Sequence, residues 1–337
     1  MTKSIFVVFS EDEEYASSWG NYVSKKSNLP YDVKIYTDIN KLREFSSKEN
    51  IDILLLEKEE SIDAKMKFVL YESIPTNPKP GFNYINRFQS ANDIFCEIAA
   101  ACEKEGQNHM HEDGKLNKTK IIGIYSPINR CLKTIFSIVL AKSLSDNNSV
   151  LYLNFEEYSA LSEIFPNEHS NNISDLLFYY KQGSQHLAMR FLASVSSWDG
   201  LDYIFPPANK EDIRKMDASE MIEFLEALKN NGDYKYFVID LGSDICEICK
   251  LLDYSDYVLM PVKNDKISKA KIEDFKKSYV QENFAFLEEK IVSGDLSRFE
   301  NSFVSCNIEH LSNSEFGLFA DTIVKGFEEN KTWNLNT

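Results

Sequence analysis

Two residues suited to binding phosphate, Lys133 and Thr134, open the helix-like run "KTIFSIVLAKSLSD", which follows the apolar run "KIIGIYS" after a short turn. A strand, a turn and a helix beginning with Lys-Thr have the outline of a phosphate-binding loop, because amides at a helix N-terminus attract anions. The turn "SPINRCL" contains no glycine, however. Glycines normally let the backbone amides converge on phosphates and adopt positive φ. The site is therefore working, weakened, or retained only as architecture.

The substituted turn carries a steric cost. Asn129, Arg130 and Leu132 stand where glycines would be expected. Asparagine tolerates the left-handed region fairly well, whereas arginine and leucine adopt it at a cost of about 1 kcal/mol or more. Further along, "YFVID" places Asp240 at the end of an apolar strand. Each residue alone is ordinary; their order along the chain is what points to a nucleotide site.

The elements that must position these residues alternate between strands and helices. After residue 120 we expect strands in "KIIGIYS", "VLYLNFEE", "GLDYIFP", "YKYFVIDLG" and "DYVLMPV". Helices are expected in "NISDLLFYYKQG", "QHLAMRFLASVSS", "DASEMIEFLEALKNN" and "KISKAKIEDFKKSYV". Right-handed crossovers would join the strands into one parallel sheet.

The first hundred residues show a second α/β alternation, from "SIFVVFS" to "ANDIFCEIAAACEKE". Near-continuous apolar runs such as "DILLL" are typical of central strands covered on both faces. The polar stretch between the two patterns lacks periodicity. We therefore predict an α/β protein with a parallel-sheet domain at residues 1–102, a linker at 103–119 and a second parallel-sheet domain at 120–337.

The second domain resembles the MinD/ParA group of P-loop ATPases across nearly all of Lys120–Phe327. "YSPINRCLKT" stands where that group has a loop of the form S-P-K-G-G-x-G-K-T, and "YFVIDLG" resembles its Walker B strand. "SDYVLMPVKNDKISKAKIEDF" is similar to the strand and loop beside the adenine. The resemblance implies a P-loop NTPase-like fold that binds ATP and Mg²⁺.

The resemblance also implies roles for individual residues. Contacts to the nucleotide would come from the loop and the adenine-side strand: Asn129, Arg130, Cys131, Leu132, Lys133, Thr134, Pro261 and Val262. Thr134 and Asp240 would hold Mg²⁺. Asn154 and Glu156 stand at the family's catalytic positions, but an amide cannot act as a base, and no residue is identified as catalytic. The signature lysine of the group falls on Ile128, which can neutralise no charge, so efficient hydrolysis is not expected.

The first domain resembles a response-regulator receiver domain, which has a flavodoxin-like fold. Glu11 and Asp12 match the receiver's acidic pair, Ser73 its hydroxyl position and Arg87 its lysine. Glu57 stands where receivers carry the phosphoacceptor aspartate, and its longer side chain would displace the carboxylate. We therefore expect no phosphorylation. A receiver-like domain joined to such an ATPase is the arrangement of the TadZ/CpaE branch, which helps to localise Flp-type pilus assembly.

Composition restricts the partners. With 37 basic and 53 acidic residues the formal charge is −16, which disfavours nucleic acid and anionic lipid. Phe316, Phe319, Ile323 and Phe327 share one face of a terminal helix, which we expect to face the core. No apolar run approaches the ~20 residues of a membrane span. We expect a cytoplasmic protein without stable membrane insertion, recruited to a pole or membrane complex through partners.

Three functions remain open from the sequence. The first is a degenerate scaffold of the TadZ/CpaE type, which would form a homodimer and bind protein partners such as pilus or secretion assembly components. The second is an active ATPase in which Arg130 replaces the signature lysine and nucleotide drives a dimer switch. The third is a DNA-partitioning ATPase of the ParA kind, against which the acidic composition argues.

Overall fold

The computed structural model describes residues 4–25, 31–72, 78–89, 91–104, 119–159, 161–165, 171–183, 187–303 and 314–328. The chain divides into two compact units. The first unit comprises Met1–Lys115 and Tyr179–Ser194, and the second comprises Leu116–Phe178 and Val195–Thr337. Residues 105–118, the centre of the predicted linker, lie outside the described residues.

The first unit contains a five-stranded parallel sheet in the order β2-β1-β3-β4-β5. Its elements in chain order are β1 (Ser4–Phe9), α1 (Glu13–Lys25), β2 (Tyr31–Tyr36), α2 (Ile39–Ser46), β3 (Ile53–Leu56), β4 (Met66–Tyr71), β5 (Asn83–Asn86) and α3 (Ala91–Lys104), followed much later by α6 (Leu187–Ser194). This is one of the two common orders of doubly wound sheets. Of the positions predicted from the receiver resemblance, Glu11, Asp12, Glu57 and Arg87 follow the carboxyl ends of these strands, and Ser73 lies outside the described residues.

Strand alternation divides the core of the first unit between the two faces of this sheet. Phe6 and Val8 belong to a cluster that also holds Trp19 of α1 and Phe95 of α3. The rings of Phe6 and Phe95 meet edge to face with centroids 5.3 Å apart. Val7 and Phe9 point to the other face, where they join Leu42 of α2. Both faces are therefore apolar and covered, as the run of buried residues predicted.

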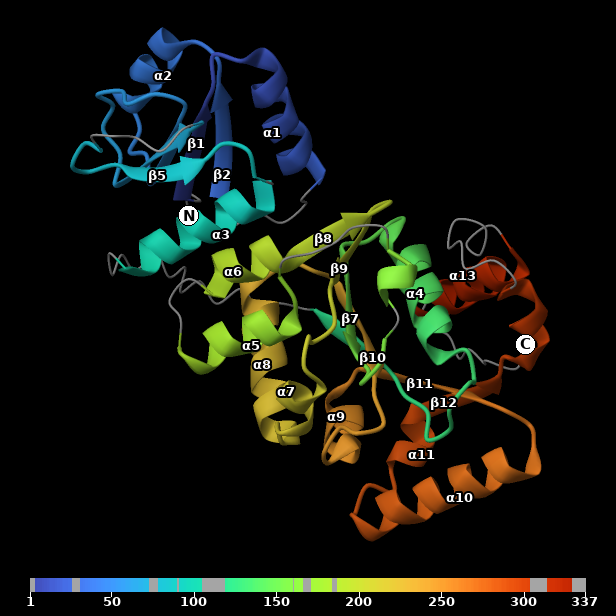
Figure 1. The fold of residues 1–337 in the computed structure, drawn as a ribbon. Coiled ribbons are helices and arrows are strands. Elements are labelled where there is room, and N and C mark those ends of the chain that lie inside the picture. The colour runs from blue at the N-terminus through green and yellow to red at the C-terminus, as the bar shows by residue number, and fades with distance from the viewer. Residues whose placement is uncertain are drawn as a thin grey trace. The chain divides into compact units, whose positions relative to one another are not determined.

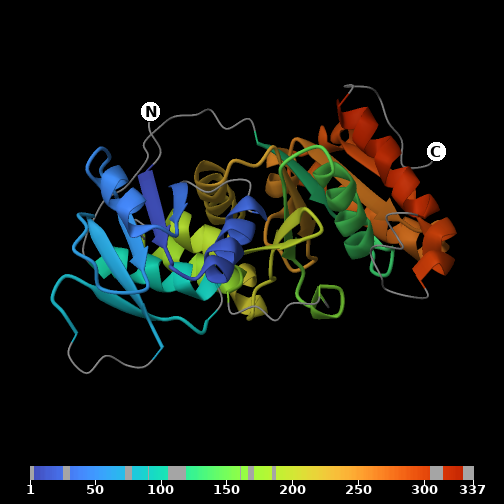
Figure 2. The same cartoon turned by 90° about the horizontal axis from the view of Figure 1, so that it is seen from above.

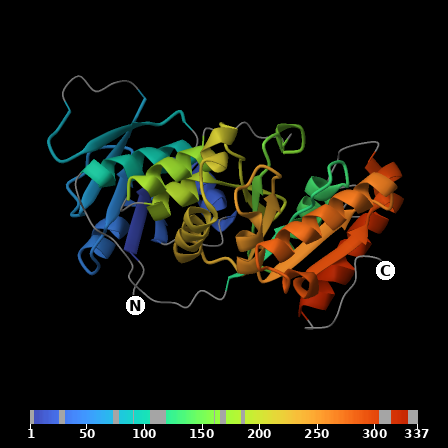
Figure 3. The same cartoon turned by 90° about the horizontal axis from the view of Figure 1, so that it is seen from below.

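Helix α6 is the unexpected member of the first unit. We predicted that residues 179–194 lie within the second domain, but they group with the first unit. Met189, Leu192 and Ala193 of α6 join the core cluster beneath α3, and Figures 1 and 3 show the two helices side by side. The sequence could not reveal this, because an apolar helix face does not identify the element that covers it.

Removing part of the α6 contact should destabilise the first unit. For Leu192→Ala, with Leu192 only 3% exposed, we expect a loss of about 2–4 kcal/mol in the free energy of unfolding. Urea unfolding would be followed by the fluorescence of Trp19, with the other two tryptophans replaced by phenylalanine. Leu318→Ala is the matched control, because Leu318 is 65% exposed. Equal midpoints for the two variants would contradict the placement of α6 in this core.

The second unit contains a seven-stranded sheet in the order β12-β11-β6-β10-β7-β9-β8. Its strands are β6 (Lys120–Ile124), β7 (Val150–Phe155), β8 (Val195–Trp198), β9 (Leu201–Ile204), β10 (Tyr236–Leu241), β11 (Tyr257–Val262) and β12 (Ile291–Asp295). Its larger helices are α4 (Lys133–Ser145), α5 (Ile173–Lys181, which ends in the first unit), α8 (Ala218–Asn231), α9 (Ile248–Tyr254), α10 (Lys266–Gln281) and α13 (Glu315–Glu328), with the short helices α7 (Lys210–Arg214) and α11 (Leu287–Lys290).

The prediction of a wholly parallel sheet is wrong at one edge. β8 pairs antiparallel with β9, through a two-residue turn in which Asp199 (φ 45°) and Gly200 (φ 84°) both have positive φ. Asp-Gly is a preferred sequence for such a hairpin turn. The sequence pattern predicts that the preceding helix continues to Ser197, whereas α6 ends at Ser194 and the chain continues directly into β8.

The prediction that the apolar face of the terminal helix faces the core is confirmed. On α13, Phe316, Phe319, Ile323 and Phe327 are all buried, and the helix lies along α4 (Figures 1 and 2). The Ser143 hydroxyl of α4 donates a hydrogen bond to Asp321 of α13. Within the described part of the chain, no helix is both long enough and apolar enough to cross a membrane.

Candidate functional site

The loop between β6 and α4 adopts left-handed turns without glycine. Arg130 has φ 55° and Leu132 has φ 61°, so the positive φ falls on two of the three residues predicted at glycine positions and not on Asn129. Non-glycine residues pay roughly 1–2 kcal/mol each in this region. Leu132 is also the N-cap of α4 and provides no side-chain capping bond. The first amides of α4 are therefore not capped by that side chain and face the loop as donors.

Replacing Arg130, one of the two strained residues of the loop, by glycine should stabilise the protein. Arg130 is exposed, and its side chain makes no ion pair or hydrogen bond with the described residues, so Arg130→Gly relieves strain without removing a polar interaction. We expect it to raise the free energy of unfolding by several tenths to about 1 kcal/mol. Arg130→Ala, which retains a Cβ, serves as the control and should leave stability near the wild-type value. If alanine stabilised as much as glycine in chemical denaturation, the gain would not come from backbone strain.

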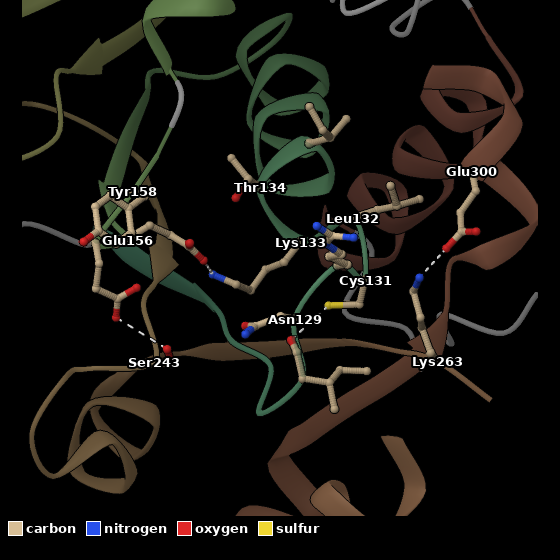
Figure 4. A pocket seen from close by; sticks show the side chains of 14 residues that line it. Asn129, Cys131, Leu132, Lys133, Thr134, Glu156, Tyr158, Ser243, Lys263 and Glu300 are labelled. Atoms are coloured by element: carbon tan, nitrogen blue, oxygen red, sulfur yellow. Dashed lines mark hydrogen bonds and ion pairs between the residues drawn. The ribbon is translucent and has the colours of Figure 1, made fainter. Parts of the chain in front are cut away.

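Lys133 lies at the centre of the site and is held by the protein's own oxygens. Its ammonium pairs with the carboxylates of Glu156 and Asp240 and donates to the Leu241 carbonyl at 2.7 Å. Figure 4 shows the Lys133 side chain reaching from the start of α4 towards Glu156. Burial by itself would lower the pKa of Lys133, but the two carboxylates outweigh it and raise that pKa. Lys133 is therefore charged, and its charge is already neutralised.

Beneath Lys133, a buried polar network fixes Asp240 at the end of β10. Asp240 and Asn154 are both fully buried, and β10 and β7 place them opposite each other. The Asn154 amide donates to Asp240 at 3.1 Å and to the Tyr152 hydroxyl at 3.0 Å, while its oxygen accepts the Glu156 N–H at 3.0 Å. Both ends of the Asn154 amide are thus occupied by structural hydrogen bonds.

A cavity of about 590 Å³ opens beside Lys133, within the ordinary size range of small-molecule sites. All six loop residues predicted to contact nucleotide line it, together with Ile128 and Glu156. Pro261 and Val262 are not among the described residues that line it; their neighbour Lys263 is. Asp240 and Asn154 lie below the cavity and do not line it. The predicted loop residues are therefore gathered around one cavity, whereas from the predicted adenine-side segment only the next residue, Lys263, reaches the cavity wall.

Further residues of the wall were not predicted. Glu157, Tyr158, Ser243, Lys263 and Glu300 also line the cavity. Four of them directly follow strand ends or lie within three residues of one, which could have identified them because ligands bind at the carboxyl ends of parallel strands. Glu300 follows β12 by five residues and had no such signal. At the rim, Lys263 and Glu300 form an ion pair of 2.6 Å (Figure 4).

Packing also fixes the turn after β10. A Cβ at Gly242 would lie 2.5 Å from the carbonyl oxygen of Phe155, so only glycine lets β10 and β7 end so close together.

On the neighbouring turn, Glu157 accepts the Asp244 N–H at 2.6 Å. Burial raises the pKa of Glu156, and its attraction to Lys133 only partly offsets this. The two consecutive glutamates therefore have different partners.

Thr134, the second residue of α4, lies at the wall of the cavity. Among the described residues, no group of three or more histidine, cysteine or acidic side chains could hold a metal ion. The predicted Mg²⁺ ligands, Thr134 and Asp240, provide one hydroxyl and one carboxylate. Oxygen donors suit Mg²⁺, which commonly takes one or two protein ligands and completes its shell with water and substrate phosphates. The donor set fits a nucleotide-bound ion better than a resident one.

No protein-family model matches the chain, and no curated protein matches it by sequence. Among solved structures, it is similar to a plasmid partition protein of Borrelia burgdorferi B31 bound to AMPPNP (18% identity, 63% of this chain, 99% of that one, TM-score 0.46). It is also similar to a ParA family ATPase of Chlorobium tepidum TLS (16%, 62% and 98%, TM-score 0.47). A third is cobyrinic acid a,c-diamide synthase of Mycobacterium smegmatis with an ATP analogue and magnesium (14%, 65% and 100%, TM-score 0.45). Likenesses at this level do not indicate what this chain binds.

Proposed function

We propose that this protein is a degenerate MinD/ParA-type ATPase that binds a nucleoside triphosphate weakly and acts as a localisation or assembly scaffold. The observation that carries the proposal is that the ammonium group of Lys133 is already paired with carboxylates of the protein. The loop still provides a cavity and a helix N-terminus for phosphate, but Lys133, the least exposed of the described cations that line the cavity, is neutralised by Glu156 and Asp240. Binding must displace these partners, which favours a weak site.

Weak binding is supported by the geometry of the loop. Backbone amides at the start of α4 and the helix dipole attract phosphate without a side chain. When nucleotide binds, Lys133 would turn towards its phosphates, and Thr134 with Asp240 would hold Mg²⁺. The ion would supply charge neutralisation at the phosphate oxygens. Arg130, exposed at the rim, could add a bidentate grip.

Hydrolysis is disfavoured by three side chains. Ile128, which occupies the signature lysine position, is 3% exposed and apolar. Asn154 is buried and committed to Asp240, Tyr152 and the Glu156 amide, so it cannot orient a water in the cavity. Glu156 is engaged by Lys133. Without a free base, and without a cation at the signature lysine position, turnover should be slow or absent.

The biological part of the proposal concerns partners. The TadZ/CpaE resemblance and the charge of −16 favour protein partners, among them pilus or secretion assembly components, and a homodimer formed through the second unit. The strand order of the first unit is the flavodoxin-like one, which supports a receiver-like domain used for docking. We place the protein in the cytoplasm, recruited to a pole or membrane complex by those partners.

One experiment separates the scaffold from an enzyme. Wild type, Arg130→Ala and Lys133→Met would be compared for binding of a fluorescent ATP analogue and for phosphate release. A scaffold binds weakly in a Lys133-dependent way and releases phosphate no faster than Lys133→Met. The alternative, an active ATPase using Arg130, is favoured by the exposed guanidinium at the rim, which pairs with no carboxylate in the described part of the chain, and it requires a turnover rate that Arg130→Ala abolishes. Absence of binding in all three would reject both.

A further inference from the structure

The cavity beside Lys133 is lined differently at its two ends. Figure 4 shows Glu156 and Ser243 on one side of Lys133, and Lys263 and Glu300 on the other. The carboxylate of Glu156 is already engaged by Lys133. At the other end, the Lys263 ammonium and the Glu300 carboxylate pair with each other at 2.6 Å. That end therefore presents a charged donor directly beside a charged acceptor.

The two segments that carry this pair are fastened to each other. Lys263 directly follows β11, and Glu300 lies in a short 3₁₀ helix after β12. Asp295, the last residue of β12, accepts the Asn264 N–H at 3.1 Å and the Ser297 N–H at 2.8 Å. One carboxylate thus ties down the start of both segments. The donor and the acceptor are therefore held at the cavity by a shared backbone framework, as recognition of a ligand requires.

Apolar side chains line the cavity together with this pair. Leu132 and Ile135 belong to the cavity wall and are half-buried against the core cluster that also contains Leu296 and Phe299. Phe299 immediately precedes Glu300, so the apolar wall and the acceptor share one packed region. Apolar surface with a few placed polar groups is the usual lining of a site for a flat organic ring. The amides at the start of α4 provide the phosphate end, and this region provides the end for a base.

We infer that Lys263 and Glu300 bind the base of the nucleotide and favour guanine over adenine, an inference that rests on the proposed nucleotide site. Guanine presents the O6 acceptor next to its N1–H and its 2-amino group. The ammonium can donate to O6 while the carboxylate accepts both N–H groups.

Adenine offers less to the same two side chains. It presents one amino group beside a ring nitrogen, so the carboxylate accepts a single N–H. Guanine therefore gains one more hydrogen bond to a charged group, and such bonds are stronger than neutral ones. Pro261 and Val262, from which adenine contacts were predicted, are not among the described residues that line the cavity.

The test compares nucleotides that differ only in the base. The full-length protein with Mg²⁺ would be titrated with GTP, ITP and ATP, each carrying a fluorescent label on the ribose. Wild type should bind GTP roughly tenfold tighter than ATP. ITP keeps O6 and N1–H but lacks the 2-amino group, so its affinity should lie between the two. Glu300→Gln, which removes the charge and one acceptor oxygen, should reduce the preference for GTP over ATP to about twofold or less.

Glu226→Gln is the matched control. Glu226 pairs with Lys229 at 2.9 Å, and its side chain is 43% exposed against 45% for Glu300, but it does not line the cavity. This variant should keep the wild-type preference for GTP. Equal affinities for GTP and ATP in wild type, or a preference that Glu300→Gln leaves unchanged, would overturn the inference and leave the nucleotide site intact. If none of the three triphosphates binds, the proposed function fails and the inference fails with it.

Discussion

Lys133→Met is expected to lower the free energy of unfolding by roughly 3–5 kcal/mol, the largest effect of any single substitution considered for this protein. The side chain of Lys133 is 10% exposed and that of its partner Asp240 is fully buried. Removing one member of a buried ion pair leaves the other charge without compensation, and this costs more than the pair contributed. Chemical denaturation followed by circular dichroism would measure the change.

The double variant Lys133→Met/Asp240→Asn tests the reason for this effect. An amide at position 240 carries no charge to compensate, so the double variant should recover much of the lost stability, and the two substitutions should not be additive. Lys142→Met is the control, because Lys142 lies on the same helix and pairs with the exposed Asp146 at 2.8 Å. Its cost should stay within about 1 kcal/mol. Equal losses for Lys133 and Lys142 variants would show that burial of the pair is not what matters.

Patterns of local sequence predicted much of this fold. Apolar runs such as Ile53–Leu56 are short, continuous and bounded by polar residues, and they became the buried central strands expected of them. The face shared by Phe316, Phe319, Ile323 and Phe327 also predicted its own burial correctly. In these cases the spacing of the apolar residues decides which side chains share one face of the helix or strand, and therefore which of them are buried.

Other features depend on tertiary contacts that no local pattern contains. The apolar face of α6 is visible in the sequence, but the α3 residues in the same core cluster, Ile94 and Phe95, lie more than ninety residues earlier, in the other predicted domain. The antiparallel β8 was hidden because its residues continued a helical pattern. Its turn, Asp199-Gly200, was the available signal.

The candidate site likewise combines residues that the local sequence predicts with a contact that it does not. The loop, Lys133 and Asp240 were identified from residue types in order, and the structure brings Lys133 and Asp240 into contact. What the sequence did not reveal is that Lys133 is also held by Glu156. That contact depends on where two side chains extend across the cavity floor. Glu156, which stands at one of the family's catalytic positions, is therefore expected to compete with a phosphate for Lys133.

Glu156→Gln should therefore tighten the binding of a nucleoside triphosphate by about tenfold, equivalent to ~1.4 kcal/mol. In the wild type a phosphate oxygen must displace the Glu156 carboxylate from Lys133, and the carboxylate would also repel the phosphate in a partly buried site. Glutamine retains the size of the side chain and removes both effects. Glu157→Gln is the control: it removes an equal charge from the same cavity, but Glu157 accepts the Asp244 amide and does not hold Lys133.

Lowering the pH should have the same effect on nucleotide affinity as the substitution Glu156→Gln. Because burial raises the pKa of Glu156, this carboxylate is protonated at a higher pH than an ordinary glutamate, and protonation releases Lys133 as glutamine does. The affinity ratio between Glu156→Gln and wild type should thus shrink as the pH falls from neutral, whereas the ratio between Glu157→Gln and wild type should not follow it. Fluorescence titrations with an ATP analogue at several pH values would measure both ratios. Equal affinities of Glu156→Gln and wild type at neutral pH, together with loss of binding in Lys133→Met, would contradict this prediction. They would show that Lys133 contacts the phosphate and that Glu156 does not compete for Lys133.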